Sequence, residues 1–175
     1  MAKLRKMLGD INSEECISLM NLIETQSKIT LATWAIGYAK RYYLGIYEAE
    51  CPDDLRFQNI ILACEEYLKG NMKLKEIKPI IKEGSQIARE ANDNPIVQAT
   101  ARAISTALST IQTPTSTLGF LFYGAAAVAY SEVGLGETTE VYNKLATVEL
   151  NRALSSLEEV SIPNEECPVK ISWNC

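Results

Sequence analysis

The sequence predicts an all-α, single-domain bundle of six to seven mostly antiparallel helices. Apolar residues recur at the helical period of about 3.6 residues along nearly the whole chain, and no segment alternates as a β-strand does. The chain has 175 residues, of which 47% are hydrophobic, so it is long enough to bury one core. Short connections between the predicted helices favour antiparallel neighbours.

The first two predicted helices have clear starts. Ser13 can cap the first helix, and acidic residues follow it at the positive end of the helix dipole. The second helix runs over 28–48 with one apolar face. Gly37 and Gly45 lie within it, and each costs about 1 kcal/mol relative to alanine, which suggests close packing at those points.

The third and fourth helices cover 53–68 and 72–92. Asp53 follows a Cys-Pro break and is a good cap for the third helix, which ends at Gly70. Pro79 lies inside the fourth pattern, so either the helix kinks there or its regular part begins near that residue.

The last three helices begin after marked breaks. Asn94-Pro95 starts the fifth helix, which runs to about residue 111. The sixth helix, over 118–133, is apolar on all sides and is therefore expected to be surrounded by others. The seventh runs over about 137–160. We predict a bundle domain over 1–160 and a C-terminal tail on the surface over 161–175.

Composition excludes several classes of function. The sequence contains no histidine, which removes histidine-based catalytic triads and histidine-ligated metals. Its 17 basic and 22 acidic residues argue against a nucleic-acid partner. The five cysteines form no CxxC pair, so no zinc or iron–sulfur site is expected. We predict no cofactor and no metal.

The same residues give an expectation for the compartment. The basic N-terminus is not followed by an apolar signal segment. The longest apolar run, over 118–130, is shorter than the ~20 residues that span a bilayer. We therefore expect a cytoplasmic protein with no membrane contact. A homodimer stays open, because the apolar sixth helix can be buried within one chain or in a dimer interface.

Two surfaces are candidates for partner binding. Aromatic residues and arginine dominate binding hot spots. The first candidate is therefore a pair of tyrosines off the main apolar stripe, with two charged neighbours: Tyr43, Tyr47, Arg41 and Glu48. The alternative is that both tyrosines pack against a neighbouring helix. The second candidate is the acidic face of the seventh helix: Glu137, Glu140 and Glu149.

Several charged residues are expected to be structural instead. We predict that they form ion pairs at helix junctions: Asp53, Asp54, Arg56, Arg89 and Arg102. Arg102 lies between two alanines and is the arginine expected to be partly buried. The hydroxyl-rich stretch 105–117, with Arg89 or Arg102, offers the alternative of a polar small-molecule or enzymatic site between the fifth and sixth helices.

A set of short motifs in a fixed order resembles a known family. The motifs cover about 30–133: Leu31-Ala32-Thr33-Trp34-Ala35 with Ala39, Asp53-Asp54-Leu55-Arg56, Lys69-Gly70, Ala88-Arg89, Ala101-Arg102-Ala103, Leu118-Gly119, Ala125-Ala126-Ala127 and Tyr130. In this order they resemble the putative bacterial immunity protein family, an immunity-five-like all-helical domain. The chain departs from the family where Thr106, Gln112 and Ser116 replace family histidines and Phe57 replaces a proline.

The resemblance implies a non-enzymatic helical binding protein that neutralises a cognate bacterial toxin by direct association. The acidic balance and the lack of a catalytic constellation are compatible with that function. The alternative, from a different class, is the small-molecule-binding or enzymatic bundle.

Overall fold

The computed structural model describes residues 3–173 and confirms the all-α bundle. Its eight α-helices are α1 (Glu14–Ile23), α2 (Lys28–Tyr42), α3 (Leu44–Glu50), α4 (Arg56–Leu68), α5 (Leu74–Glu90), α6 (Pro95–Leu108), α7 (Ser116–Val133) and α8 (Thr139–Val160). A short 3₁₀ turn, Ser109–Ile111, follows α6. Among the described residues no strand is present, and the one isolated bridge pairs Ser27 with Pro168.

The helix predicted over 28–48 is divided into α2 and α3 at Tyr43. The backbone of Tyr43 departs from helical geometry (φ −111°, ψ −34°), although its N–H still donates to the carbonyl of Ala39. The bend turns the Tyr43 ring inward, where it is fully buried. Because the predicted helix is divided in two, the structure has more helices than the predicted six to seven, but the fold is the one predicted.

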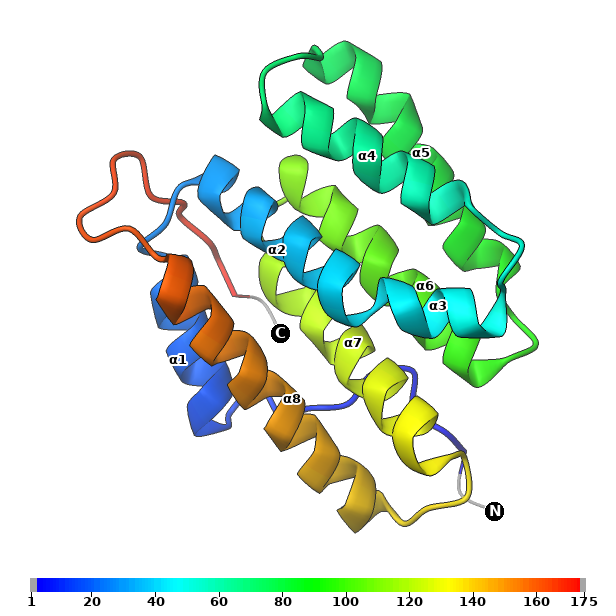
Figure 1. The fold of residues 1–175 in the computed structure, drawn as a ribbon. Helices are drawn as coiled ribbons and strands as arrows, with labels where there is room; N and C mark the ends of the chain where they lie inside the picture. The colour runs from blue at the N-terminus through cyan, green and yellow to red at the C-terminus, as the bar shows by residue number, and fades with distance from the viewer. Residues whose placement is uncertain (1–2, 174–175) are drawn as a thin grey trace.

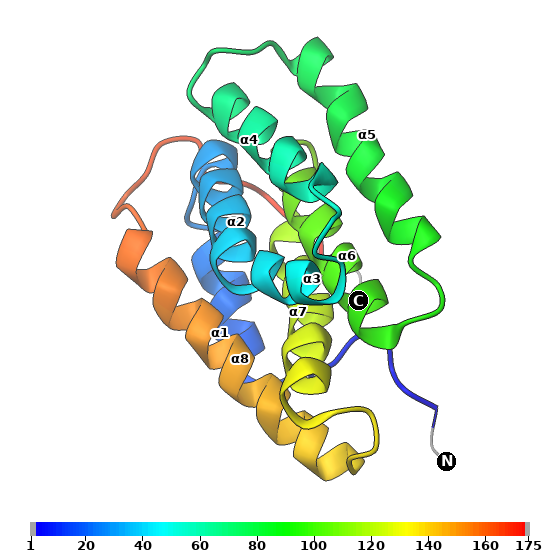
Figure 2. The ribbon, with the colours of Figure 1, turned by 45° about the vertical axis from the view of Figure 1, so that its right-hand side comes forward.

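The helices pack around a central antiparallel pair, α6 and α7. The α4–α5 hairpin lies on one side of this pair, while α1 and α8 lie on the other (Figures 1 and 2). Helix α2 lies beside α6 and α7 (Figure 1), and hydrogen bonds from Trp34 and Tyr38 join it to α8. Helix α7 is buried on most sides, as expected for a helix that is apolar all round.

Local chemistry explains the helix boundaries. The side chains of Ser13, Ser27 and Asn94 each accept a backbone N–H from the first turn of the following helix. Helix α5 continues through Pro79. The proline leaves one carbonyl, that of Lys75, without its usual donor, and Lys75 lies in an exposed first turn where water can bind it.

The two chain ends pack against the bundle. In the N-terminal segment Leu8 is buried and its N–H donates to the carbonyl of Phe122 in α7 (3.1 Å). In the C-terminal tail Val169, Ile171 and Trp173 are half-buried against the core. The predicted tail ends at 175, and positions 174 and 175 lie outside the described residues. None of the helices between residues 3 and 173 has both the length and the apolar character needed to cross a membrane.

Candidate functional site

A groove of about 460 Å³ lies between α2 and α8. One wall is an exposed row of residues four apart on α2: Ile29, Thr33, Gly37 and Arg41. The other wall comes from the end of α8 and the start of the tail: Ser156, Val160 and Ile162. The floor is aromatic, with Trp34, Tyr38 and Tyr42. We call this surface the α2–α8 groove.

Two hydrogen bonds fix how the helices run past each other. Trp34 Nε1 donates to Ser156 Oγ (3.0 Å), and four residues later on α2 the Tyr38 hydroxyl donates to Glu149 Oε2 (2.9 Å). Position increases along α2 as it decreases along α8, so the helices are antiparallel. The groove therefore has an apolar end at Ile29 and an arginine end at Arg41.

A buried carboxylate lies beneath the arginine end. Glu149 is 2% exposed, and Tyr38 (2.9 Å) and Tyr43 (2.7 Å) donate hydrogen bonds to its Oε2. Arg152 forms an ion pair with the same carboxylate and donates from Nε to the Tyr38 hydroxyl (3.1 Å). The Arg152 guanidinium also lies 3.9 Å from the ring centroid of Tyr42. Every oxygen of the carboxylate is thus bound, as burial of a charge requires.

The electrostatics of this cluster keep its hydroxyls as donors. Burial raises the pKa of Glu149, although hydrogen bonds from Tyr43 and the charge of Arg152 oppose the shift. Burial and the neighbouring carboxylate also raise the pKa of Tyr38 and of Tyr43, so both stay protonated at neutral pH. The cluster joins α2 and the bend after it to α8, and so it supports the groove from below.

The C-terminal tail holds the apolar end of the groove in place. The side chain of Gln26, which is buried, donates to the Ile162 carbonyl (3.1 Å) and accepts from the Ile162 N–H (2.8 Å). The Gln26 carbonyl accepts from the N–H of Val169 (2.9 Å). Glu165 accepts from the N–H of Ser27 and from the Thr30 hydroxyl, at the positive end of α2.

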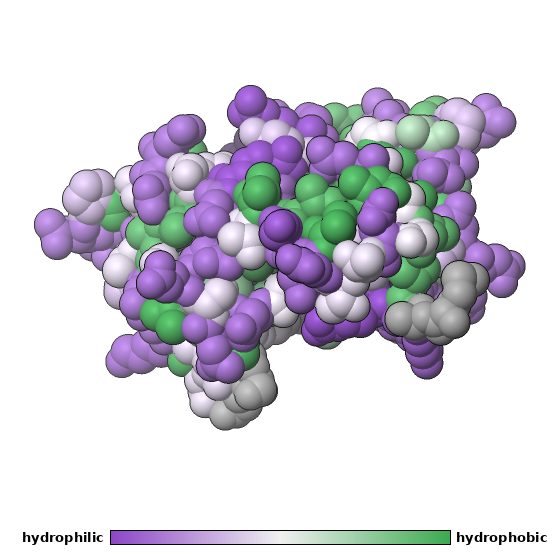
Figure 3. Space-filling model, turned by 90° about the horizontal axis from the view of Figure 1, so that it is seen from below, coloured by the Kyte–Doolittle hydropathy of each residue, from purple (hydrophilic) through white to green (hydrophobic). Residues whose placement is uncertain are grey.

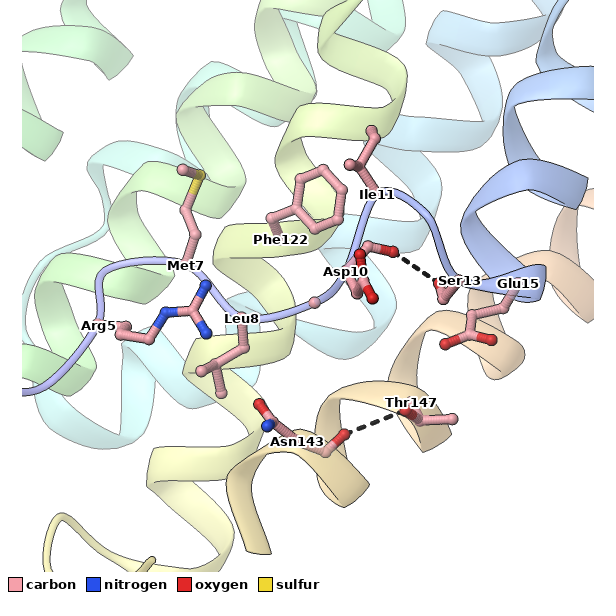
Figure 4. A pocket seen from close by; sticks show the side chains of 11 residues that line it. Arg5, Met7, Leu8, Asp10, Ile11, Ser13, Glu15, Phe122, Asn143 and Thr147 are labelled. Carbon is pink, nitrogen blue, oxygen red and sulfur yellow. Dashed lines mark hydrogen bonds between the residues drawn. The ribbon is translucent and has the colours of Figure 1, made fainter. Parts of the chain in front are cut away.

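A second groove, of about 670 Å³, lies between the N-terminal segment and helices α7 and α8. Phe122 and Leu8 form its apolar part, and Arg5, Asp10 and Glu15 supply charges (Figure 4). Its polar groups bond to nearby backbone: the Ser13 hydroxyl donates to the Asp10 carbonyl and the Thr147 hydroxyl to that of Asn143. These local bonds belong to helix starts and turns and do not converge on one point.

Apolar side chains are also visible at the end of the molecule where α7 stops and α8 begins. Figure 3 shows them gathered between hydrophilic neighbours on that end. Exposed residues of these segments include Leu135 and Val148, which line two separate grooves. The Leu135 groove is lined by Tyr130 and Tyr142, which pack edge to face, and the Val148 groove has no aromatic residue.

The predicted tyrosine surface is wrong, because both tyrosines are interior. Tyr43 is 0% and Tyr47 2% exposed, and the Tyr47 hydroxyl donates to Asp54 Oδ2 (2.6 Å). The bend between α2 and α3 rotates both rings toward the core. Of their two charged neighbours, Arg41 lies on the α2–α8 groove, while Glu48 is half-buried on α3 and lines no part of it.

The predicted acidic face of α8 needs a correction at one position. Glu137 and Glu140 are exposed as expected, whereas Glu149 is buried in the cluster beneath the groove. Its spacing of three residues from Arg152 lets the two side chains pair on the inner side of α8.

The predicted junction arginines have three different surroundings. Arg56 pairs with Asp54 (2.9 Å) and with Glu90 of α5 (3.2 Å), and its guanidinium holds the pKa of Asp54 well below the usual range. Asp53 is exposed beside this pair.

The other two arginines do not form the predicted pairs within the part of the chain that the structure describes. Arg89 is exposed and lies within ion-pair distance of no carboxylate there. Arg102 is half-buried, its Nε has no hydrogen-bond partner, and its guanidinium lies 6.0 Å from the Tyr123 ring. An aromatic face, which carries partial negative charge, takes the place of the expected carboxylate.

The hydroxyl-rich stretch after α6 bonds mainly to itself. The Ser109 hydroxyl donates to the Thr106 carbonyl (2.7 Å) and shares a hydrogen bond with the Ser116 hydroxyl (2.9 Å). The Thr110 hydroxyl donates to the Ala107 carbonyl (2.5 Å). These bonds shape the turn from α6 to α7. Among residues 3–173, there is no group of three or more cysteine, aspartate or glutamate side chains placed so that it could hold a metal ion.

Sequence reasoning missed most of the groove. The spacing of four between Trp34, Tyr38 and Tyr42 favours core positions for all three. The structure buries the first two but leaves Tyr42 half-exposed in the groove floor. The feature of the sequence that could have indicated the groove is Gly37, a glycine on the exposed side of α2.

Comparison with known proteins gives the family. No curated protein and no solved structure matches the chain. A family model described as Imm-5 like putative immunity protein matches residues 21–154, which include α2 to α7 and most of α8. The match covers more than half of the chain and agrees with the resemblance found in the motifs over 30–133. The chain belongs to the Imm-5 like putative immunity protein family.

Proposed function

We propose that this protein neutralises a cognate toxin by direct association and that the toxin docks on the α2–α8 groove. Family membership implies a protein partner such as a toxin. The observation that carries the choice of surface is the groove itself, an aromatic floor with an arginine at its edge. Aromatic and arginine side chains dominate the binding energy of protein interfaces.

The support beneath the groove favours a binding role. The bonds of Glu149 with Tyr38 and Arg152 fix one end, and the bonds of Gln26 with Ile162 fix the other. Side chains that are already ordered lose less conformational entropy on association, so more of the contact energy appears as affinity. The groove is therefore suited to tight binding without rearrangement.

Charge gives the proposed partner its general character. The net charge of −5 and the exposed Glu137 and Glu140 at the start of α8 would attract a basic toxin and speed the encounter. In this proposal the protein acts in the cytoplasm, has no catalytic activity and blocks the toxin by occupying its surface.

The test is a protection assay with the products of the neighbouring genes. Each product is expressed in a host with and without this protein, and growth is measured. We expect one product to be toxic alone and harmless with this protein, and the two purified proteins to form a complex in isothermal titration calorimetry. If none of the neighbouring products is toxic, or none binds, the proposal fails.

The surface is tested with two matched variants. Ile29 in the groove is 53% exposed and Ile17 on α1, outside the groove, is 46% exposed. Ile29→Arg should abolish protection, because a charge replaces an apolar contact, whereas Ile17→Arg should protect like the wild type. If both variants protect equally and still bind the toxin, the interface does not lie on the groove.

A further inference from the structure

We infer that the partner segment held in the α2–α8 groove carries an apolar side chain at one end and a carboxylate at the other. The inference deepens the proposed function and rests on it for the identity of the partner. It concerns the chemistry of the segment, which the two ends of the groove define.

Gly37 leaves room for a backbone or side chain of a partner to approach α2 closely. It lies in the middle of the helix, where glycine is unfavourable relative to alanine, and a Cβ at this position would have nothing within 4 Å. No contact within the described chain therefore requires a glycine there. Gly37 lines the groove, and a glycine is the residue that lets another chain approach most closely.

The arginine end carries positive charge with no internal partner. Arg41 is exposed, and within residues 3–173 it contacts the Tyr42 ring (5.0 Å) but no carboxylate. The charge of Arg152, whose guanidinium lies 3.9 Å from the centroid of the same ring, is balanced by Glu149. Arg41 is thus free to bind a carboxylate of the partner, the group that a guanidinium binds with two parallel hydrogen bonds.

The apolar end offers side chains that water covers in the free protein. Ile29, Val160 and Ile162 are 53%, 49% and 47% exposed. They come from α2, α8 and the tail and meet at the same end of the groove. An apolar side chain docked among them would remove this surface from water, which favours association.

The distance between the two ends sets the spacing in the partner. Ile29 and Arg41 are twelve positions apart on α2, which corresponds to about 18 Å along the helix axis. An extended partner segment would cover that length with about five or six residues. A carboxylate in the bound segment is compatible with a toxin that is basic overall. The net charge of the toxin steers its approach, whereas a single ion pair with Arg41 fixes how the segment lies in the groove.

The experiment uses phage-displayed random 12-residue peptides as the probe. The library is selected on the wild-type protein, with counter-selection on Gly37→Leu, in which the new side chain narrows the groove. We expect enriched peptides to carry an aspartate or glutamate and a large apolar residue at the predicted spacing. Their affinity should fall about tenfold or more in Gly37→Leu and in Arg41→Glu.

Two control variants separate groove contacts from general effects. Gly45 is also a helical glycine with nothing near its Cβ position, so Gly45→Leu makes the same change on α3. Lys78 is exposed on α5, away from the groove, so Lys78→Glu makes the same change of net charge as Arg41→Glu. Both controls should bind the selected peptides within about threefold of the wild type.

The outcomes discriminate this inference from the proposed function. Enriched peptides without an acidic residue, equal binding to Arg41→Glu and Lys78→Glu, or no enrichment would overturn the inference. A concentration-dependent dimer that Gly37→Leu dissolves, measured by light scattering, would also overturn it, because a second copy would then occupy the groove. Peptide binding as expected, with no neighbouring toxin neutralised, would retain the inference and reject the proposed function.

Discussion

Two helix–helix interfaces of the bundle differ in the residues that form them: the one between α6 and α7, and the one between α2 and α8. The two helices of the first carry small apolar residues that are fully or almost fully buried: Ala99, Ala101, Ala103 and Ala107 on α6, and Ala125, Ala126, Ala127 and Ala129 on α7. The second contains a buried carboxylate, three tyrosines and an arginine, and it leaves a groove open at the surface.

Under the proposed function, this difference separates stability from recognition. Small side chains let two helices approach closely and gain many dispersion contacts without any polar group to satisfy. A buried ion pair, by contrast, often contributes little net stability, since the cost of removing its charges from water offsets their attraction. The α2–α8 interface therefore gives the molecule an ordered, polar-edged surface, while the α6–α7 interface holds the bundle together.

The largest expected effect is the loss of the buried carboxylate. Glu149→Ala leaves two buried hydroxyls, those of Tyr38 and Tyr43, without an acceptor, so we expect unfolding free energy to fall by about 2–4 kcal/mol. Glu149→Gln keeps an acceptor of the same shape and should cost much less. Chemical denaturation of both variants measures the difference. Equal stability of the two would mean that the hydrogen bonds to Glu149 do not hold α8 in place.

Next in size is an added methyl group between the two interfaces. A Cβ on Gly124 of α7 would lie 2.1 Å from the Tyr43 ring. Gly124→Ala should therefore destabilise the protein by about 1–3 kcal/mol through overpacking. The matched control is Gly37→Ala, which has open space and should stabilise the helix by up to about 1 kcal/mol. Thermal unfolding of the two variants should shift in opposite directions, and a shared direction would contradict this account.

A smaller and more local effect is expected at the tail. Gln26→Ala removes both hydrogen bonds to the Ile162 backbone and should cost about 1–2 kcal/mol. Hydrogen exchange should accelerate in the tail and around Ile162, with little change in α6 and α7. Protection of the tail at the wild-type level would show that the apolar packing of Val169 and Ile171 is sufficient to hold it.

The smallest expected effect is a dependence of stability on pH. The pKa of Glu149 is raised in the folded state, so its contribution is fully present below the unfolded pKa of about 4.3 and is lost as pH rises through the folded value. Compared with Glu149→Gln, the wild type should therefore lose stability as pH rises above about 4.3. The difference between the two denaturation profiles removes the contributions of other groups such as Asp54, whose pKa is lowered. An unchanged difference across pH would show that Glu149 titrates alike in both states.

Much of the fold could be predicted from the sequence because its signals are local. Caps such as Ser13 and Asn94 and the apolar period of each helix depend on neighbours within a few residues. The uniform hydropathy of α7 also indicated its central position correctly. These features are properties of single helices, so they do not require knowledge of which helix is adjacent.

The site could not be predicted in the same way, because it depends on the rotation of helices against one another. Tyr43 is off the apolar stripe of an ideal helix, but the bend between α2 and α3 turns it inward. Glu149 occupies an acidic stretch, yet it faces two tyrosines that are more than 100 positions away in sequence. Such contacts are fixed by tertiary packing, which overrides local patterns.

The attachment of the C-terminal tail has a consequence for the proposed docking surface. Val160 and Ile162, which form one wall of the groove, lie beyond the residues that match the family model. Hydrogen bonds join the tail to one glutamine and to the start of α2, and Val169, Ile171 and Trp173 pack against the core. Replacing this short segment would reshape the wall while the alanine-packed centre stays as it is. Under the proposed function, substitutions confined to this edge would change which partner binds and leave the scaffold intact.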